Sequence, residues 1–432
     1  MISKALLKQV LLENRVLVEQ KKIFPREIQL GEFPRCVLVG VRRSGKSYLL
    51  FQRMQRMLAA GKSWQDMLYV NFEDERLLGF DVGDFNRILE VHAEMTGSES
   101  RPALFLDEIQ LIDGWEKFVR RMADAQAEIY VTGSNAKMLS VDVAASLGGR
   151  FITVNVFPLS FSEYLSAKGI DAHCDRSATT TGKAMIQRVF EEFFTFGGFP
   201  ESLDLANKTE CLNTLFQKIY LGDIVVRNKV SSVFSLRMLI KKIADSIGQP
   251  ISYSRLAGIV NANGVKLAKN TCITYVRNIC DSCVLLQVQN IVGAVQERET
   301  SPKYYFVDNG LIRLLKFDVT ADLLEHVVAL HLLRTYGLNE RVFFYTRQAE
   351  VDFFVPDEGL AVQACVALGN DPDTVARETG AFDKLAKEFT VHRRVIVTLE
   401  EERTIESDKG SIEVVPAWKW LLQTTASNRQ VS

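Results

Sequence analysis

Short apolar runs alternate with amphipathic stretches through the first 160 residues of the chain. The runs are four to six residues long, and in the stretches between them apolar positions recur at helical spacing. A parallel sheet covered by helices on both faces produces this alternation, because its strands are buried on both sides. We therefore predict strands over five segments: 35–39, 67–72, 103–106, 128–132 and 151–156.

Helical periodicity is clearest near the N-terminus. Residues 3–20 place Leu6, Val10 and Leu17 on one stripe and keep charged side chains off it, as in a surface helix. A second helical pattern runs from Lys46 through Met57.

The pattern changes after Pro158. Residues 161–228 are mostly helical, and the rest of the chain mixes helices with strands. The helices predicted in this later part span 235–247, 252–261, 267–282 and 321–336. The strands predicted there span 284–289, 303–307, 341–346, 350–355, 360–366, 395–399 and 412–415.

The composition is that of an ordinary globular protein, with 432 residues, 47% hydrophobic and 24% charged. At roughly 150 residues per domain, this length predicts about three domains. Lysine and arginine number 52 against 53 for aspartate and glutamate, so the net charge is −1. Any binding of nucleic acid would therefore need a local basic patch.

No stretch predicts a membrane span or a secretory signal. The longest uncharged run, Ser282 to Gln296, has 15 residues, whereas a span needs about 20 apolar ones. Charged residues from Lys4 to Arg15 interrupt the apolar positions that a signal peptide would need. We expect a cytoplasmic protein with no membrane partner.

The seven cysteines and five histidines are scattered along the chain. An odd number of cysteines in a long chain argues against a disulfide scaffold. Cys280 and Cys283 form a lone CxxC without the further ligands of a zinc site, so we interpret them as buried thiols. We predict no metal site built from protein side chains alone.

A phosphate-binding signature lies between the first predicted strand and the helix after it. Residues 40–47 match GxxxxGK[ST]. Its glycines let backbone N–H groups face a phosphate, and the N-terminus of the following helix favours the anion. Lys46 can reach the β- and γ-phosphates, and the Ser47 hydroxyl can bind Mg²⁺. The predicted nucleotide-binding residues here are Gly40, Val41, Arg42, Arg43, Ser44, Gly45, Lys46, Ser47 and the adjoining Tyr48.

A carboxylate for the metal is expected at the end of another strand. Residues 104–108 read Leu-Phe-Leu-Asp-Glu, an apolar strand that ends in two acids. Asp107 would hold Mg²⁺ together with Ser47, mostly through water, and Glu108 would act as general base toward the attacking water. The plain alternative is a pair of solvated acids at a strand end.

Three more polar residues are candidates for the site. Ser134 and Asn135 follow the strand at 128–132, and ligands bind at the carboxyl ends of parallel strands, so both could contact the γ-phosphate or the water. A turn that caps the next helix is the alternative. Arg150 is a candidate arginine finger, in its own chain or in a neighbour, or else an arginine packed on the sheet rim.

The ordered set of motifs resembles the bacterial and archaeal AAA-type ATPases that carry a C-terminal domain of unknown function. The resemblance extends over nearly the whole chain and implies ATP binding with hydrolysis, but it indicates little about biological role. Besides the phosphate loop and residues 104–108, it rests on Thr132–Asn135, Gly149–Arg150, Phe157–Leu165, Gly197–Glu201, Tyr220–Arg227, Lys303–Leu311 and Glu350–Phe353.

Pattern and resemblance together predict an α/β fold. It would comprise the parallel sheet of a P-loop NTPase, a helical lid, a winged-helix domain and a C-terminal α/β nuclease-like domain. The expected boundaries are 1–160 for the ATP-binding core, 161–228 for the lid, 229–315 for the winged helix-turn-helix and 316–432 for the nuclease-like domain.

A local basic region coincides with the predicted winged helix. Residues 230–290 hold seven bases and two acids, a net charge of +5. Two helices within 252–282, followed by two strands, fit a winged helix-turn-helix that contacts DNA, although such modules also dock proteins or act as regulatory lids. DNA and an unidentified protein are therefore both candidate partners. The expected contacts on the second helix are Lys269, Asn270, Thr274 and Arg277.

The resemblance implies that the C-terminal part has a restriction-nuclease-like fold. Such a site uses a helix Glu, a strand Asp and a Glu-x-Lys on the next strand, and Glu325 and Asp352 occupy the first two places. The third place reads Gln363-Ala364-Cys365. Glutamine lacks the charge to bind Mg²⁺ firmly, and Cys365 cannot replace a lysine. We predict a dismantled site without nuclease activity.

The leading hypothesis is an ATP-driven switch with ATP and Mg²⁺ as its ligands. One alternative is a nucleic-acid-binding regulator in which ATP is mainly structural, and another is a protein-interaction scaffold. A homo-oligomer is a further candidate, because Arg150 acting in trans would require a second copy.

Overall fold

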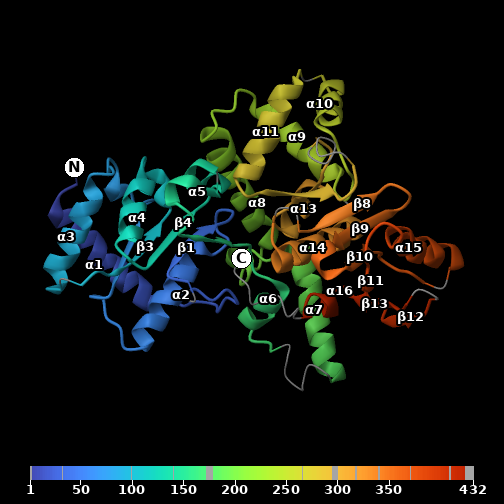
Figure 1. Cartoon of the computed structure of the whole chain (residues 1–432), viewed down its shortest axis with the longest axis horizontal. Helices are drawn as coiled ribbons and strands as arrows, with labels where there is room; N and C mark the ends of the chain where they lie inside the picture. The colour runs from blue at the N-terminus through green and yellow to red at the C-terminus, as the bar shows by residue number, and fades with distance from the viewer. Residues whose placement is uncertain are drawn as a thin grey trace. The chain divides into compact units, whose positions relative to one another are not determined.

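The chain forms two compact units, Met1–Phe157 and Pro158–Gln430, in this computed structural model (Figure 1). Cys174 lies outside the described residues. The structure describes residues 2–31, 33–98, 100–139, 141–171, 179–264, 266–293, 300–316, 319–338, 341–369, 371–407 and 410–423.

The first unit contains a five-stranded, wholly parallel sheet with the order β2-β3-β4-β1-β5. All five strands predicted for this unit are confirmed, and β3 and β4 are buried at every position. The strands are β1 (Arg35–Val39), β2 (Met67–Asn71), β3 (Ala103–Asp107), β4 (Ile129–Gly133) and β5 (Ile152–Asn155).

Helices cover this sheet (Figure 1). Helix α1 packs against α2, α3 and β2, and α2 packs against β4. The hydrophobic core joins Leu50 and Met54 of α2 to Leu38, Phe105 and Tyr130 of the strands. The helices are α1 (Lys4–Gln20), α2 (Lys46–Ala59), α3 (Asp84–Thr96), α4 (Trp115–Asp124) and α5 (Val141–Leu147).

Strand register brings the predicted motifs to one edge of the sheet. Val39 is paired with Gly133, and Asn71 is paired with Asp107. The loop after β1 and the polar ends of β3 and β4 therefore lie at the same carboxyl edge, where ligands bind in parallel sheets.

The second unit begins with helices and a π-helical segment, Ile219–Val226. Helix α10 packs against both α9 and α11. The helices of this part are α6 (Phe161–Ala167), α7 (Thr180–Phe196), α8 (Lys208–Lys218), α9 (Val233–Asp245), α10 (Tyr253–Ala262) and α11 (Lys269–Asp281).

The second unit continues into an eight-stranded mixed sheet with the order β12-β13-β11-β10-β9-β8-β6-β7. Its strands are β6 (Leu285–Asn290), β7 (Lys303–Phe306), β8 (Phe343–Thr346), β9 (Glu350–Val355), β10 (Leu360–Ala364), β11 (Arg393–Thr398), β12 (Arg403–Ile405) and β13 (Ile412–Pro416). Its helices are α13 (Asn309–Leu315), α14 (Thr320–Tyr336), α15 (Pro372–Leu385) and α16 (Ala417–Trp420).

The antiparallel pair β6–β7 follows three helices, as a wing would. However, β6 also pairs in parallel with β8, so strands on both sides of residue 315 share one sheet. The expected boundary at 315 therefore does not separate two sheets, because hydrogen bonding continues across it. The winged helix-turn-helix stays a prediction.

Several features that other protein classes require are missing from the described residues. No helix there combines the length and the hydrophobicity of a membrane span. The cysteines there are free thiols. Within the same residues, no group of three or more His, Cys, Asp or Glu side chains is placed to hold a metal ion.

Two motifs from the sequence meet in a buried joint of the second unit. Asp308 caps α13 by accepting a hydrogen bond from the Gly310 amide at 2.9 Å, and it accepts another from Gly198 at 2.7 Å. A Cβ on Gly197 would lie 1.8 Å from Asp308 Oδ1. Asn309 donates to the carbonyl of Phe193 at 2.8 Å near the end of α7. These residues therefore hold α7 against α13.

A buried lysine lies among the acids that the sequence singles out in the C-terminal part. Lys303 of β7 is fully buried, with Nζ 3.2 Å from Glu325, 3.1 Å from Glu350 and 3.7 Å from Asp352. Gln363 accepts a hydrogen bond from the Asp352 amide at 2.8 Å. The structure thus places an ammonium beside Glu325 and Asp352, supplied by a strand that the sequence pattern did not connect with them.

The charge of Asp308 should make stability depend on pH. Burial raises the pKa of Asp308 from its ordinary 3.8 to about 6. A carboxyl whose pKa is higher in the folded state stabilises at low pH, and this contribution is lost as the pH rises through the folded pKa. Asp308→Asn should therefore gain about 2 kcal/mol relative to the parent between pH 4 and pH 8.

Chemical unfolding at both pH values would measure this gain. Asp245→Asn, which changes an exposed carboxylate that pairs with Lys242, is the matched control. A constant difference between Asp308→Asn and the parent at both pH values would contradict the prediction.

Removal of the buried Lys303 ammonium should lower the free energy of unfolding by an amount that depends on pH. The pKa of Asp352 is raised by burial and by Glu325, and Lys303 opposes that rise. Without Lys303 the pKa of Asp352 in the folded state rises further. The loss of stability is therefore largest at pH values above this pKa, and it becomes smaller at low pH. Lys303→Met should lose about 3–5 kcal/mol of unfolding free energy at pH 8 and less at pH 5.

Denaturant titration at the two pH values would test this loss. Lys242→Met removes a partly exposed partner of Asp245 and should lose less than about 1 kcal/mol. Equal losses for the two variants would show that the buried cluster does not depend on its ammonium.

Candidate functional site

The phosphate loop, residues 40–47, connects β1 to α2. Its backbone turns back sharply, with the Ser44 amide donating to the Val41 carbonyl at 3.2 Å. Gly45 has a φ of 98° immediately before α2, a left-handed conformation that glycine adopts without strain. Arg43 is also left-handed, with a φ of 65°. The loop therefore presents the N-terminus of α2, a ready site for an anion.

Gly40 is required by a close backbone contact. A Cβ on Gly40 would lie 2.0 Å from the carbonyl oxygen of Val156 and 3.1 Å from Ser44 Oγ. Any larger residue would push the loop away from the chain that follows β5. The first glycine of the motif is therefore fixed by space as well as by backbone freedom.

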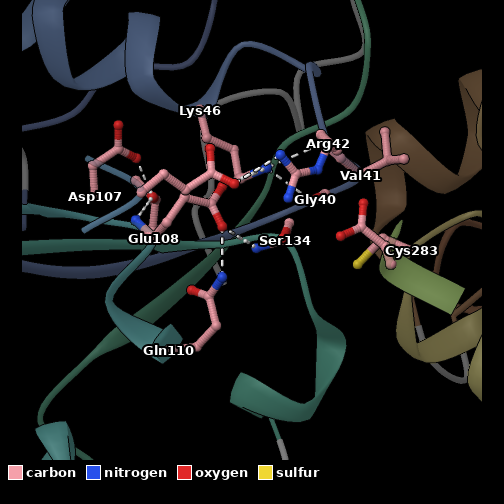
Figure 2. Close-up of polar contacts among 12 residues, drawn as sticks. Gly40, Val41, Arg42, Lys46, Asp107, Glu108, Gln110, Ser134 and Cys283 are labelled. Atoms are coloured by element: carbon pink, nitrogen blue, oxygen red, sulfur yellow. Dashed lines mark hydrogen bonds and ion pairs between the residues drawn. The ribbon is translucent and has the colours of Figure 1, made fainter. Parts of the chain in front are cut away.

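Lys46 lies at the centre of the site (Figure 2). Its side chain is buried, and Nζ donates to the carbonyl oxygens of Gly40 at 3.0 Å and Val41 at 3.1 Å. The ammonium also lies 3.5 Å from Glu108 Oε1. One buried cation thus bridges the loop backbone and the carboxylate that follows β3.

Asp107, the last residue of β3, is buried among hydroxyl groups. The Tyr69 hydroxyl donates to it at 2.9 Å, and the hydroxyls of Thr132 and Ser47 also form hydrogen bonds with it. Burial and then the charge of Glu108 raise the pKa of Asp107, against the effect of the three hydroxyls. The carboxylate and the Ser47 hydroxyl are hard oxygen ligands of the kind that Mg²⁺ prefers.

Glu108 is held in a strained position beside the loop. Its φ of 52° is left-handed, which is uncommon for a residue with a side chain. Its amide donates to Thr132 Oγ1 at 2.9 Å. Its Oε2 accepts from Gln110 Nε2 at 2.5 Å and from the Ser134 amide at 3.2 Å (Figure 2). The carboxylate is therefore fixed from several sides.

Opposing effects set the pKa of Glu108. Burial alone would raise it. The Lys46 ammonium opposes that rise most strongly, followed by the hydrogen bond from Gln110 and the charge of Arg42. Together these partners leave the pKa of Glu108 below its usual value. The side chain is therefore ionised at neutral pH.

An unsatisfied hydroxyl fits an anionic ligand in the loop. Ser44 Oγ is buried without a hydrogen-bond partner in the part of the chain that the structure describes. A buried polar atom left in this way costs roughly 1–3 kcal/mol. A phosphate oxygen beside the loop would supply the partner. The residues present thus fit a nucleotide phosphate, with Ser47 and Asp107 placed for Mg²⁺ beside it.

The remaining predicted loop residues are Arg42, Arg43 and Tyr48. Arg42 forms an ion pair with Glu73 at 2.7 Å. Arg43 is exposed. Tyr48 lies in the first turn of α2, and the Lys21 ammonium lies 5.5 Å from the centre of its ring. None of these contacts shows a role in binding, so all three residues stay predictions.

Ser134 and Asn135 occupy the turn after β4. Ser134 is buried, and its amide contacts Glu108. Asn135 accepts a hydrogen bond from the Met138 amide at 3.1 Å through its backbone carbonyl, and its role toward the nucleotide stays a prediction. The structure thus brings Ser134 to the acids and gives Asn135 a structural contact.

Arg150 lies at the opposite edge of the sheet. It precedes β5, which runs parallel to β1, whereas the phosphate loop follows the carboxyl end of β1. Its guanidinium pairs with Asp124, the last residue of α4, at 2.8 Å. In this arrangement the length of the sheet separates Arg150 from the phosphate loop of its own chain, and its role as an arginine finger stays a prediction. Action in trans stays a proposal.

Sequence reasoning missed three residues that hold the acids: Tyr69, Gln110 and Thr132. Thr132 carried a signal, because it belongs to the polar cluster that ends β4. Gln110 lies two positions after Glu108, in a short helix that the pattern does not indicate. No sequence signal marked Tyr69, since a tyrosine within an apolar strand resembles any core residue.

Two family models match the chain. One is described as "AAA domain" and covers residues 32–165. The other is described as "Domain of unknown function (DUF8612)" and covers residues 187–321.

Solved structures of low identity also match. The Walker-type ATPase PABY2304 of Pyrococcus abyssi is 14% identical, with a TM-score of 0.38, over 70% of this chain and 100% of that one. Cdc6p from Pyrobaculum aerophilum is 12% identical, with a TM-score of 0.24, over 76% of this chain and 93% of that one.

Two relatives match almost end to end. An "Uncharacterized protein" of Haemophilus influenzae is 30% identical over 90% of this chain and 94% of its own. "Uncharacterized protein MJ1544" of Methanocaldococcus jannaschii is 30% identical over 97% of this chain and 96% of its own. The chain belongs to the family of these relatives, and it carries an AAA domain at residues 32–165.

Proposed function

We propose that this protein binds ATP with Mg²⁺, hydrolyses it, and uses the turnover to switch its second unit between states. The observation that carries this proposal is the position of Lys46, buried between the loop carbonyls and Glu108. The contact between Ser47 and Asp107 supports the metal requirement.

Each part of the site has a role in this proposal. Backbone amides of residues 40–47 and the Lys46 ammonium bind the phosphates. Ser47 and Asp107 hold Mg²⁺, which when bound supplies positive charge against the phosphate oxygens. Glu108 takes the proton of the attacking water.

Phosphate binding would change the partners of Lys46. A triphosphate carries more negative charge than one carboxylate, so it competes with Glu108 for the ammonium. Lys46 is also the main partner that lowers the pKa of Glu108. As the lysine turns to the phosphate, the carboxylate becomes a stronger base. Gln110 and the Ser134 amide keep it in place.

A switch requires contacts that differ between nucleotide states. The Lys46–Glu108 pair is one such contact, because it responds directly to the charge in the loop. The protein that the switch would act on is unidentified, and a homo-oligomer would supply Arg150 in trans. A scaffold without turnover is the alternative that an ATPase assay excludes.

A second candidate function is nucleic-acid binding through α11. Lys269, Asn270, Thr274 and Arg277 are all exposed along this helix. The opposite side is buried through Cys272, Val276 and Ile279. Polar and basic side chains are therefore free to meet phosphates while the helix stays packed. In this alternative, ATP is mainly structural.

Two variants separate nucleotide binding from hydrolysis. Lys46→Ala should abolish ATP binding, since it removes the buried cation of the loop. Glu108→Gln should bind ATP but slow turnover by about 10²–10⁴-fold, the range that a general base contributes. A fluorescent ATP analogue measures binding, and phosphate release with Mg²⁺ measures turnover.

Lys62→Ala is a suitable control because Lys62 is exposed and pairs only loosely with Asp66, at 3.8 Å. It should bind and hydrolyse ATP like the parent. Turnover by Lys46→Ala at the parent rate would exclude the proposed site.

A salt titration of duplex binding tests the second candidate. If α11 contacts phosphates, the logarithm of affinity falls linearly with the logarithm of salt concentration. Replacing Lys269 and Arg277 together by alanine should reduce that slope by about two, one for each phosphate contact. A slope near zero in the parent would remove the DNA candidate.

A further inference from the structure

Arg26 contacts the outer side of the phosphate loop. It lies in the segment between α1 and β1, and its side chain is buried. Nη1 donates to the Ser44 carbonyl at 2.9 Å, and Nη2 donates to the Phe157 carbonyl at 2.9 Å. The planar guanidinium thus joins the loop to the chain that follows β5.

The position of Arg26 is itself fixed from α2. The Arg26 amide donates to Gln52 Oε1 at 2.8 Å, and Gln52 Nε2 donates to the Arg26 carbonyl at 3.3 Å. Ile23 and Ile28, on either side of Arg26, pack against the core of the unit. The guanidinium is therefore held at a defined place, by the helix that begins at the phosphate loop.

The guanidinium also lies close to the residue with the most unusual backbone in the loop. A Cβ on Gly45 would lie 2.9 Å from Arg26 Nη1. In a phosphate loop the amides face the ligand, so the carbonyls face away and need other donors. Arg26 provides that donor at Ser44, whose side chain we assign to the phosphate side.

We propose that Arg26 is a positioning residue of the nucleotide site, which holds the Ser44 carbonyl so that the loop amides face the phosphate. The inference rests on the proposed function. No position of the GxxxxGK[ST] motif includes this residue, which lies 14 positions before Gly40. Its role comes from a planar fork in which two different nitrogens each donate to a separate carbonyl, a geometry that the single nitrogen of a lysine does not reproduce.

The proposal predicts a specific kinetic signature. Loop amides contact the phosphates in both the bound and the reacting complex, so misplacing them removes binding energy from both. Arg26→Met should therefore raise the dissociation constant and KM for ATP by roughly tenfold to a hundredfold, as expected for a lost charged hydrogen bond. The value of kcat should change by less than about threefold.

Titration with a fluorescent ATP analogue, steady-state turnover and thermal unfolding without nucleotide form the test. Arg53→Met is the matched control, because Arg53 on α2 pairs with Glu128 at 2.9 Å and is partly buried, away from the loop. A residue that only stabilised the fold would lower the fraction of active protein and the melting temperature, and the remaining protein would bind ATP normally.

Two further variants test the role of Arg26 if Arg26→Met does not fold. Arg26→Lys keeps the charge but not the fork, and should restore only part of the affinity. Gln52→Leu removes both bonds to the Arg26 backbone and should weaken ATP binding in the same direction. The proposal would be overturned if Arg26→Met bound ATP as tightly as Arg53→Met does. It would also be overturned if folded Arg26→Lys and Gln52→Leu both bound ATP with that affinity.

The result for the parent separates this inference from the proposed function. If the folded parent takes up no ATP in the presence of Mg²⁺, the proposed function fails and the role of Arg26 fails with it. If the parent binds ATP and the Arg26 variants bind equally well, only the role of Arg26 is excluded.

Discussion

Charge buried at the carboxyl edge of the parallel sheet is the constraint on which the first unit depends. Lys46, Asp107 and Glu108 all lie out of water, where an unpaired charge is costly. Each therefore has several partners: carbonyls for the ammonium, hydroxyls for Asp107, and an amide side chain for Glu108. A ligand that brings new charge to this edge would therefore meet groups whose partners are already in place.

The second unit meets the same constraint in a different way. Lys303 neutralises acids on α14 and β9, and Asp308 accepts hydrogen bonds from two backbone amides. Asp308 lies in one of the motifs that carry the family resemblance and Gly198 in another. Their contact shows that part of this resemblance reflects a buried joint between helices, so those motifs alone are not evidence for a second chemical site.

Local patterns predicted much of the fold and of the nucleotide site. Strands such as 35–39 are buried on both faces, and a continuous apolar run indicates such burial directly. The phosphate loop is contiguous, so its chemistry can be read from the residues in order. Which side chains contact each other depends on which strands are neighbours and on the edge at which a residue lies. The contacts of Arg150, Lys303 and Tyr69 are of this kind. These are tertiary facts that spacing along the chain does not contain.

The position of Phe157 connects the nucleotide site to the rest of the chain. It is the last residue of the first unit, and its carbonyl shares a guanidinium with the Ser44 carbonyl of the phosphate loop. The neighbouring Val156 carbonyl leaves no room for a side chain on Gly40. A displacement of the loop therefore cannot leave this exit segment unaffected, because both contacts involve packed or hydrogen-bonded backbone. The switch proposed above would need a connection of this kind, since a ligand shifts a conformation only through contacts that differ between states.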